Sequence, residues 1–305
     1  MTVTTQSPEI GAGYRRGVIL VLLAGSCWST MGLGIRLIEV ANVWQILLYR
    51  SLALAPFLFL IITFRSRGKP FAVIRRAGLS AVFGGIGLVL AFSGGIHAIQ
   101  STSVANAMFL FAAAPFIAAV LGLIILKEQV RRATWLAMAL AIVGILVMIG
   151  GGLSTGQWIG NLAALVSACG FAIFTIALRW KKLEDMMPAV FLAGVFSIVL
   201  ATLVCLATDL PFVIPRSDIG IALAMGIFQL GLGLLLYTLG SKSLPAAELA
   251  LLSMSEVVLG PLWVWMAIGE TAHVHTLIGG AILMAAIIGN AISGMRRRPG
   301  PITFS

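Results

Sequence analysis

The sequence predicts an all-α integral membrane protein whose ten transmembrane helices form two inverted five-helix repeats. Three observations lead to this fold class: the scarcity of charge, ten apolar segments, and a similarity between the two halves of the chain. Of the 305 residues, 60% are hydrophobic and only 10% are charged, whereas a soluble domain carries about 25% charged residues. Since so few charged side chains cannot cover a soluble molecule of this size, the composition excludes a soluble enzyme and a long disordered segment.

Each of the ten apolar segments is long enough for a helix that crosses a bilayer, which takes about 20 residues. Arg15 and Arg16 precede the first segment, as in a signal peptide, but its length favours a span that is retained. The segments lie at residues 17–38, 44–64, 77–97, 102–126, 132–150, 157–179, 188–207, 218–240, 245–268 and 273–294.

The basic residues predict the orientation of these spans. Of the 20 Lys and Arg residues, 17 fall in the two tails and in alternate connections, and the exceptions are Arg36, Arg50 and Arg216. Because cytoplasmic loops are enriched in Lys and Arg, we expect the tails at 1–16 and 295–305 to be cytoplasmic. The net charge of +10 is then an orientation signal, and we expect no nucleic-acid partner.

Charged landmarks recur at a nearly constant spacing. Arg36 and Arg179 end the first and sixth segments, 143 positions apart, while Glu128 and Glu270 follow the fourth and ninth segments, 142 positions apart. The spacing predicts one repeat at 17–150 and a second at 157–294. Since five spans per repeat is an odd number, the two repeats lie in opposite orientations, and such proteins bind substrates near the membrane midplane between the halves.

Glu256 is the most informative single residue, because it lies about halfway along the ninth segment. An ionised carboxylate at that depth is costly in lipid, so it must face protein or a water-filled cavity. It shares a helical stripe with Ser253, Gly260 and Trp263. We predict that Glu256 binds a cationic group of a substrate or takes up a proton; the alternative is a structural glutamate that ties helices together.

Other polar side chains lie at membrane depth. Arg50, six residues into the second segment, binds a carboxylate or instead extends to the interface. Ser29 belongs to a stripe of small residues in the first segment that Trp28 borders, and Gln229 and Tyr237 share a stripe of the eighth. Small residues at this spacing favour close helix packing, and cavity lining is the functional alternative for Trp28, Gln229, Tyr237 and Trp263.

Catalytic and metal-binding chemistry lacks support in the sequence. Cys27, Cys169 and Cys205 lie in apolar segments at no metal-ligand spacing, which favours small core residues. We expect no intramembrane aspartate, and the three histidines lie at segment ends or in a loop. The sequence therefore predicts no enzyme, no cofactor and no metal site.

Several runs resemble the EamA repeat of the drug/metabolite transporter superfamily. In the first half these are 101–106, 115–119, 126–128 and 144–147, with Cys27-Trp28-Ser29 and Tyr49-Arg50 near the start; in the second they are 244–248, Glu256 and Gly269-Glu270. Where the second repeat of the family usually has Glu-Pro, this chain has Glu256-Val257, with proline at Pro261.

The resemblance implies a ten-helix exporter or exchanger of small metabolites in the bacterial inner (plasma) membrane. Similar members include exporters of aromatic amino acids, with which Trp28, Tyr49, Tyr237 and Trp263 are compatible. The expected partners are a small-molecule substrate, the lipid bilayer and protons as a coupling ion. The alternatives are proton-coupled efflux of organic cations, drugs or nucleosides, and a membrane scaffold that transports nothing.

Overall fold

The computed structural model describes residues 8–153, 157–180, 185–244, 249 and 252–295. These ranges form helices, turns and loops without a strand. The helices are α1 (Pro8–Ser29), α2 (Met31–Arg36), α3 (Val43–Arg65), α4 (Pro70–Ser101), α5 (Val104–Phe111), α6 (Ala114–Ile125), α7 (Arg132–Leu153), α8 (Trp158–Trp180), α9 (Met187–Ala207), α10 (Arg216–Ala224), the π-helix η1 (Met225–Leu232), α11 (Gly233–Ser241), α13 (Ser255–Ile268) and α14 (Val274–Met295).

The predicted class is confirmed: this is an all-α membrane protein. Nine helical segments in the described part of the chain are long and apolar enough to cross a membrane, and α13 is a shorter apolar helix. Part of the expected ninth segment, at 245–248 and 250–251, lies outside the described residues.

The third span starts earlier than the sequence indicated. We expected residues 77–97, but α4 begins at Pro70 and contains Gly78 with φ 57° and ψ −149°. Glycine reaches this backbone conformation, which side chains with a Cβ rarely adopt. Gly78 therefore separates a short helical segment, which carries Arg75 and Arg76, from the long apolar part of α4.

Several spans are interrupted. Thr30 separates α1 from α2, and Ala112 and Ala113 separate α5 from α6. Pro56 and Pro261 lie inside α3 and α13, whereas Pro115 lies at the start of α6, where a proline leaves no helical hydrogen bond unmade. Pro115 therefore lies at the boundary between two helices.

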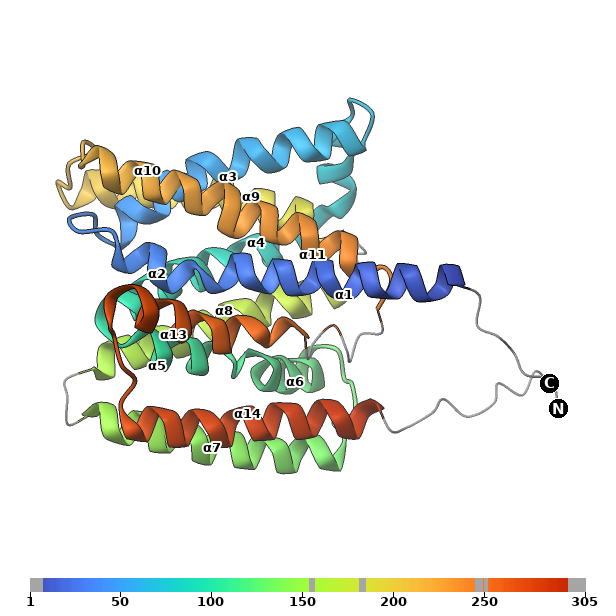
Figure 1. Ribbon diagram of the computed structural model, residues 1–305. Helices are drawn as coiled ribbons and strands as arrows, with labels where there is room; N and C mark the ends of the chain where they lie inside the picture. Colours follow the sequence, from blue (N-terminus) through green and yellow to red (C-terminus); the bar gives the residue numbers. More distant parts are fainter. Residues whose placement is uncertain (1–7, 154–156, 181–184, 245–248, 250–251, 296–305) are drawn as a thin grey trace, which may run out of the picture.

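Helices of the first half pack against helices of the second. The equivalent helices α7 and α14 lie side by side and run in opposite directions (Figure 1), as inverted repeats require. α4 packs extensively on α8, where a Cβ on Gly87 would lie 2.8 Å from the carbonyl oxygen of Gly170. The glycine-rich part of α4 is therefore a close-packing element.

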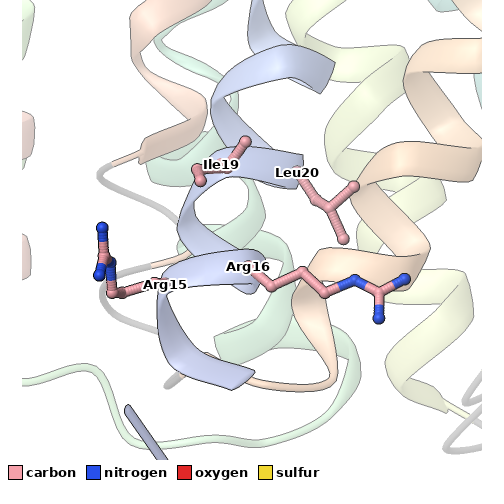
Figure 2. A pocket seen from close by; sticks show the side chains of 4 residues that line it. All are labelled: Arg15, Arg16, Ile19 and Leu20. Carbon is pink, nitrogen blue, oxygen red and sulfur yellow. The ribbon is translucent and has the colours of Figure 1, made fainter. Parts of the chain in front are cut away.

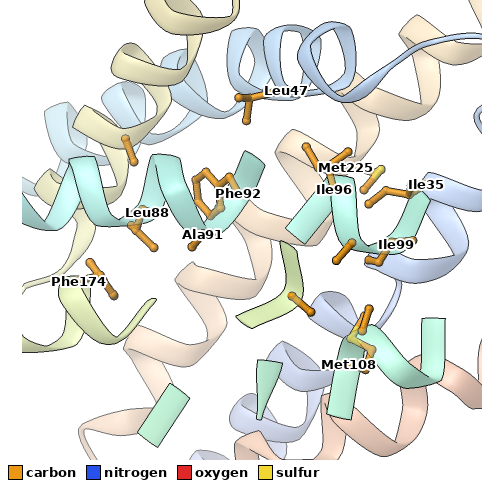
Figure 3. Packing of buried hydrophobic residues seen from close by; sticks show 14 of the residues in the cluster. Ile35, Leu47, Leu88, Ala91, Phe92, Ile96, Ile99, Met108, Phe174 and Met225 are labelled. Carbon is orange, nitrogen blue, oxygen red and sulfur yellow. The ribbon is translucent and has the colours of Figure 1, made fainter. Parts of the chain in front are cut away.

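The apolar core is continuous across both halves. Phe92 and Ile96 of α4 lie between Leu47 of α3 and the helices below them (Figure 3), and all three side chains are buried. This packing holds the helices that carry the polar residues described next.

Candidate functional site

Glu256 lies directly after a turn in its span. The chain forms a turn at Met254, and α13 begins at Ser255, so Glu256 occupies the first turn of α13. The partial positive charge at a helix N-terminus favours a carboxylate at this position. The sequence predicted the depth of Glu256 but placed it inside one continuous helix.

The first repeat has a break at the equivalent position. Ala112, between α5 and α6, precedes Met254 by 142 residues, the same spacing that relates Glu128 to Glu270. Both interruptions are tightened turns whose backbone stays right-handed, with φ −64° and ψ −7° at Ala112 and φ −65° and ψ −12° at Met254. Irregular helices in corresponding positions of two inverted repeats are candidates for the substrate site. The first break consists of Ala112 and Ala113, so the carboxylate occurs only at the second.

α1 packs against the start of α13. A methyl group on Gly25 would overlap the hydroxyl of Ser255 and lie 3.7 Å from the backbone nitrogen of Glu256. The Ser255 hydroxyl is buried and has no hydrogen-bond partner among the described residues. A residue of the first repeat therefore borders the carboxylate-bearing turn of the second.

Aromatic side chains extend this contact. The Trp28 and Tyr237 rings lie 5.1 Å apart between centroids, tilted by 43°, and Tyr237 forms a side-chain hydrogen bond with Ser253 and lies close enough to interact electrostatically with Glu256. The indole N–H of Trp263 donates a hydrogen bond of 2.8 Å to the Ser29 hydroxyl.

We call these residues the Glu256 cluster; its members are Trp28, Ser29, Tyr237, Ser253, Glu256 and Trp263. Ser29 is buried and the others are partly exposed. Five of the eight predicted site residues belong to the cluster, and they come from both halves of the chain. The cluster combines one carboxylate, three aromatic side chains and three hydroxyl groups, which suits a cation with an apolar substituent.

Arg50 belongs to a different part of the core. Its side chain is 0% exposed, so it does not extend to the interface. Its guanidinium carbon lies 4.7 Å from the centroid of the Phe92 ring, and its three nitrogens have no hydrogen-bond partner among the described residues. An unpaired buried cation is costly, which makes Arg50 a candidate for binding an anionic group.

Gln229 and Tyr49 complete the predicted set. Gln229 lies in η1, where it is 4% exposed and its side-chain carbonyl oxygen has no partner in the described part of the chain. The Tyr49 hydroxyl donates to the carbonyl oxygen of Phe212 at 2.5 Å, so its described hydrogen bond ties α3 to the loop after α9.

Asp218 corrects the expectation that no aspartate lies within a span. It is 1% exposed in the first turn of α10, two residues inside the apolar segment Arg216–Ser241. Its carboxylate accepts hydrogen bonds from the backbone N–H groups of Val40 and Ala41, each at 3.0 Å. Asp218 therefore anchors the loop after α2. The sequence signal that could have revealed this buried aspartate is its position at the start of an apolar segment.

Two surface pockets of the described residues lie away from the Glu256 cluster. One, of about 380 Å³, is lined by Arg15, Arg16, Ile19 and Leu20, and the two arginines point to opposite sides of α1 (Figure 2). The other, of about 510 Å³, lies at the start of α4 around Arg75 and Arg76. Both are open and combine arginine with apolar residues, as expected at a membrane interface.

A sequence profile of the EamA-like transporter family matches this chain twice, over residues 15–150 and 158–292. The chain belongs to the EamA-like transporter family. The resemblance inferred from its motifs is thereby confirmed, and with it the drug/metabolite transporter superfamily. As an EamA-like protein it is a multi-pass membrane transporter that handles a small-molecule substrate.

Relatives of this EamA-like chain carry the same general description. An "Uncharacterized transporter" of Helicobacter pylori is 23% identical over 284 residues, which is 88% of this chain and 92% of the relative. One of Archaeoglobus fulgidus is 26% identical over 197 residues, covering 63% of this chain and 69% of the relative. A solved crystal structure matches with a TM-score of 0.66 at 19% identity, covering 93% of this chain and all of that one, which supports the fold.

Proposed function

We propose that this EamA-like transporter exports or exchanges small zwitterionic metabolites, with amino acids that have aromatic or hydrophobic side chains favoured. The observation that carries the proposal is the position of Glu256 in the first turn of α13, among aromatic residues from both halves. The ammonium group of an amino acid would bind at Glu256, and its apolar side chain would lie against Trp28 and Tyr237. Contact between a cation and an aromatic ring adds about 0.5–2 kcal/mol.

Arg50 supports a zwitterion over a simple organic cation. A cationic drug needs a carboxylate and apolar walls, which the Glu256 cluster supplies. It would not pair with the buried guanidinium of Arg50, because both carry a positive charge. Arg50 lies outside the Glu256 cluster, so one amino acid would reach both only as the two repeats move. The carboxylate of the amino acid would then satisfy the free nitrogens of Arg50 through paired hydrogen bonds. Gln229, whose side-chain oxygen is also unsatisfied, and Tyr49 remain candidate contacts of lower rank.

Transport in this proposal proceeds by alternating access. The repeats at 17–150 and 157–294 rock against each other, so that the site opens to one side of the membrane at a time. The tails at 1–16 and 295–305 lie in the cytoplasm of a bacterium, in agreement with the distribution of Lys and Arg. Glu256 exchanges a proton as substrate binds and leaves, which couples export to the proton gradient.

A substrate panel in reconstituted liposomes tests the proposal. Vesicles are loaded with labelled aromatic, aliphatic, acidic and basic amino acids, nucleosides and organic cations, and efflux is compared with that from protein-free vesicles. We expect aromatic and aliphatic amino acids to leave faster. Efflux of only nucleosides or organic cations would replace the substrate class, and no efflux of any compound would contradict the exporter hypothesis.

A matched pair of variants tests the site. Glu256→Gln removes the carboxylate charge with little change in volume, and we expect transport to be lost while the protein still folds. Glu39→Gln is the control, since Glu39 is an exposed carboxylate in the loop after α2. Wild-type transport by Glu256→Gln would exclude this site, as would equal losses in the two variants.

A further inference from the structure

Two ion pairs that are related by the repeat join the halves of the molecule at opposite ends of the bundle; a third pair between the halves, Arg65–Asp185, is longer at 3.8 Å. Arg36, at the end of α2, binds Glu270 in the loop between α13 and α14 at 2.7 Å. Arg179, near the end of α8, binds Glu128 in the loop between α6 and α7 at 2.5 Å. In Figure 1 the first pair of elements meets at the end of the bundle where α2 stops, and the second meets at the other end.

In each ion pair the arginine and the glutamate come from different repeats. The two arginines are equivalent positions 143 residues apart, and the two glutamates are equivalent positions 142 residues apart. Neither arginine pairs with the glutamate of its own half. Each arginine instead binds the glutamate of the other half, so one interaction occurs twice, once at each end.

The geometry gives these pairs opposite roles in any rocking motion of the repeats. Opening the bundle at the α2 end separates Arg36 from Glu270, whereas opening it at the other end separates Arg179 from Glu128. An ion pair within one repeat would be unaffected by either motion.

The two pairs differ in strength. The Arg36 guanidinium also donates to the carbonyl oxygen of Thr102 at 2.7 Å, and Glu270 also accepts from the backbone N–H of Val104 at 2.7 Å. Side-chain exposure is 25% and 22% for Arg36 and Glu270, against 48% and 42% for Arg179 and Glu128. Less exposed pairs with additional hydrogen bonds are the stronger ones.

We propose that Arg36–Glu270 and Arg179–Glu128 are the two gate latches of the transport cycle, each holding one end of the bundle closed while the other opens. This inference rests on the alternating access of the proposed function. The latch at the α2 end is the stronger of the two, so its loss should change the balance between the two ends more than loss of the other. The four residues position the repeats and do not bind substrate.

Thiol labelling tests the latches without any substrate, so it separates this proposal from that of the substrate class. Cys27, Cys169 and Cys205 are replaced by alanine, and Ser253→Cys provides a reporter in the Glu256 cluster. A membrane-impermeant thiol reagent is then applied to oriented proteoliposomes, from one side or the other. Arg36→Gln and Arg179→Gln each remove one latch, and Arg216→Gln controls for loss of an exposed arginine at the α2 end.

We expect Arg36→Gln to raise labelling from the side of the α2 end and to lower it from the opposite side, and Arg179→Gln to do the reverse. The change is about two- to fivefold, as for loss of a partly exposed ion pair, and larger for Arg36→Gln. The exchanged double variant, Arg179→Glu with Glu128→Arg, restores the wild-type pattern, since these two side chains make no further described hydrogen bond that the exchange would break. Unchanged labelling, or equal changes from both sides in both variants, would overturn the proposal.

A reducible cross-link provides a second test. The pairs Arg36→Cys with Glu270→Cys and Glu128→Cys with Arg179→Cys are joined by a short bifunctional thiol reagent. Either link should stop transport of the substrate found in the panel, and a reductant should restore it. Transport at the uncross-linked rate with either link in place would contradict the latch role.

Discussion

The Trp263 indole N–H and the Ser29 hydroxyl form a 2.8 Å hydrogen bond that joins α13 of the second half to α1 of the first. The Ser29 hydroxyl in turn donates to the carbonyl oxygen of Ser26 at 2.7 Å. A chain of two hydrogen bonds thus runs from the helix that carries Glu256 to the backbone of the first span.

A double-mutant cycle measures this link. Ser29→Ala and Trp263→Phe each remove the hydrogen bond, and we expect a coupling energy of about 0.5–1.5 kcal/mol, the net contribution of one such bond. Ser29→Ala also leaves the indole N–H without an acceptor. The measurement is denaturant unfolding in detergent; strictly additive effects would mean that the bond contributes nothing to stability.

The close approach of α3 and η1 depends on Gly226. A methyl group there would overlap the carbonyl oxygen of Arg50, a backbone atom that has no room to move aside. We expect Gly226→Ala to lower the free energy of unfolding by about 1–3 kcal/mol. Gly220→Ala is the control on the same span, because nothing lies within 4 Å of its added methyl group, and it should be neutral or stabilising.

Thermal unfolding of the two glycine variants tests whether α3 and η1 approach this closely at Gly226. If Gly226→Ala unfolds at the same temperature as Gly220→Ala, the helices do not approach as closely as described.

We expect Arg50 to lower the free energy of unfolding when no substrate is bound and to raise the affinity for the substrate. Its guanidinium is buried and unpaired among the described residues, so Arg50→Met removes a desolvated charge and should leave the unfolding temperature unchanged or higher. Affinity for an amino acid should fall about tenfold or more, since a hydrogen bond to a charged group contributes about 1.5–3 kcal/mol.

Arg50→Lys keeps the charge but loses the planar fork of donors, so its affinity should lie between those of wild type and Arg50→Met. Substrate binding is measured by calorimetry beside the unfolding temperature. Wild-type affinity in Arg50→Met would exclude Arg50 from the site.

Asp218 should control the order of the loop after α2. Its two oxygens accept hydrogen bonds from the backbone N–H groups of Glu39, Val40 and Ala41. Asp218→Asn replaces one acceptor oxygen by a donor and removes the charge, so the amides of this loop should exchange hydrogen faster. Mass spectrometry of residues 37–42 measures the change, and Asp209→Asn, at an exposed position, should have no effect there.

The sequence by itself determined the class, the spans and the repeats, because these depend on local composition and on spacing. An apolar run long enough to span the membrane can be identified from the local sequence alone, and so can a single glutamate within it. The charged landmarks also identified the two halves, since Arg36, Arg179, Glu128 and Glu270 recur at a spacing that similar hydrophobic helices alone would not impose.

Only the tertiary structure decided which of these residues meet. Arg36 and Glu270 are 234 positions apart, and nothing local shows that each arginine pairs with the glutamate of the other half. Two other contacts also depend on how the helices pack: Arg50 lies buried against the Phe92 ring, and Asp218 accepts hydrogen bonds from a loop far away in the sequence. The turn before Glu256 contains no proline, so the local sequence does not predict it. A span of the right length is encoded residue by residue, but a contact between spans exists only once two helices have been brought together.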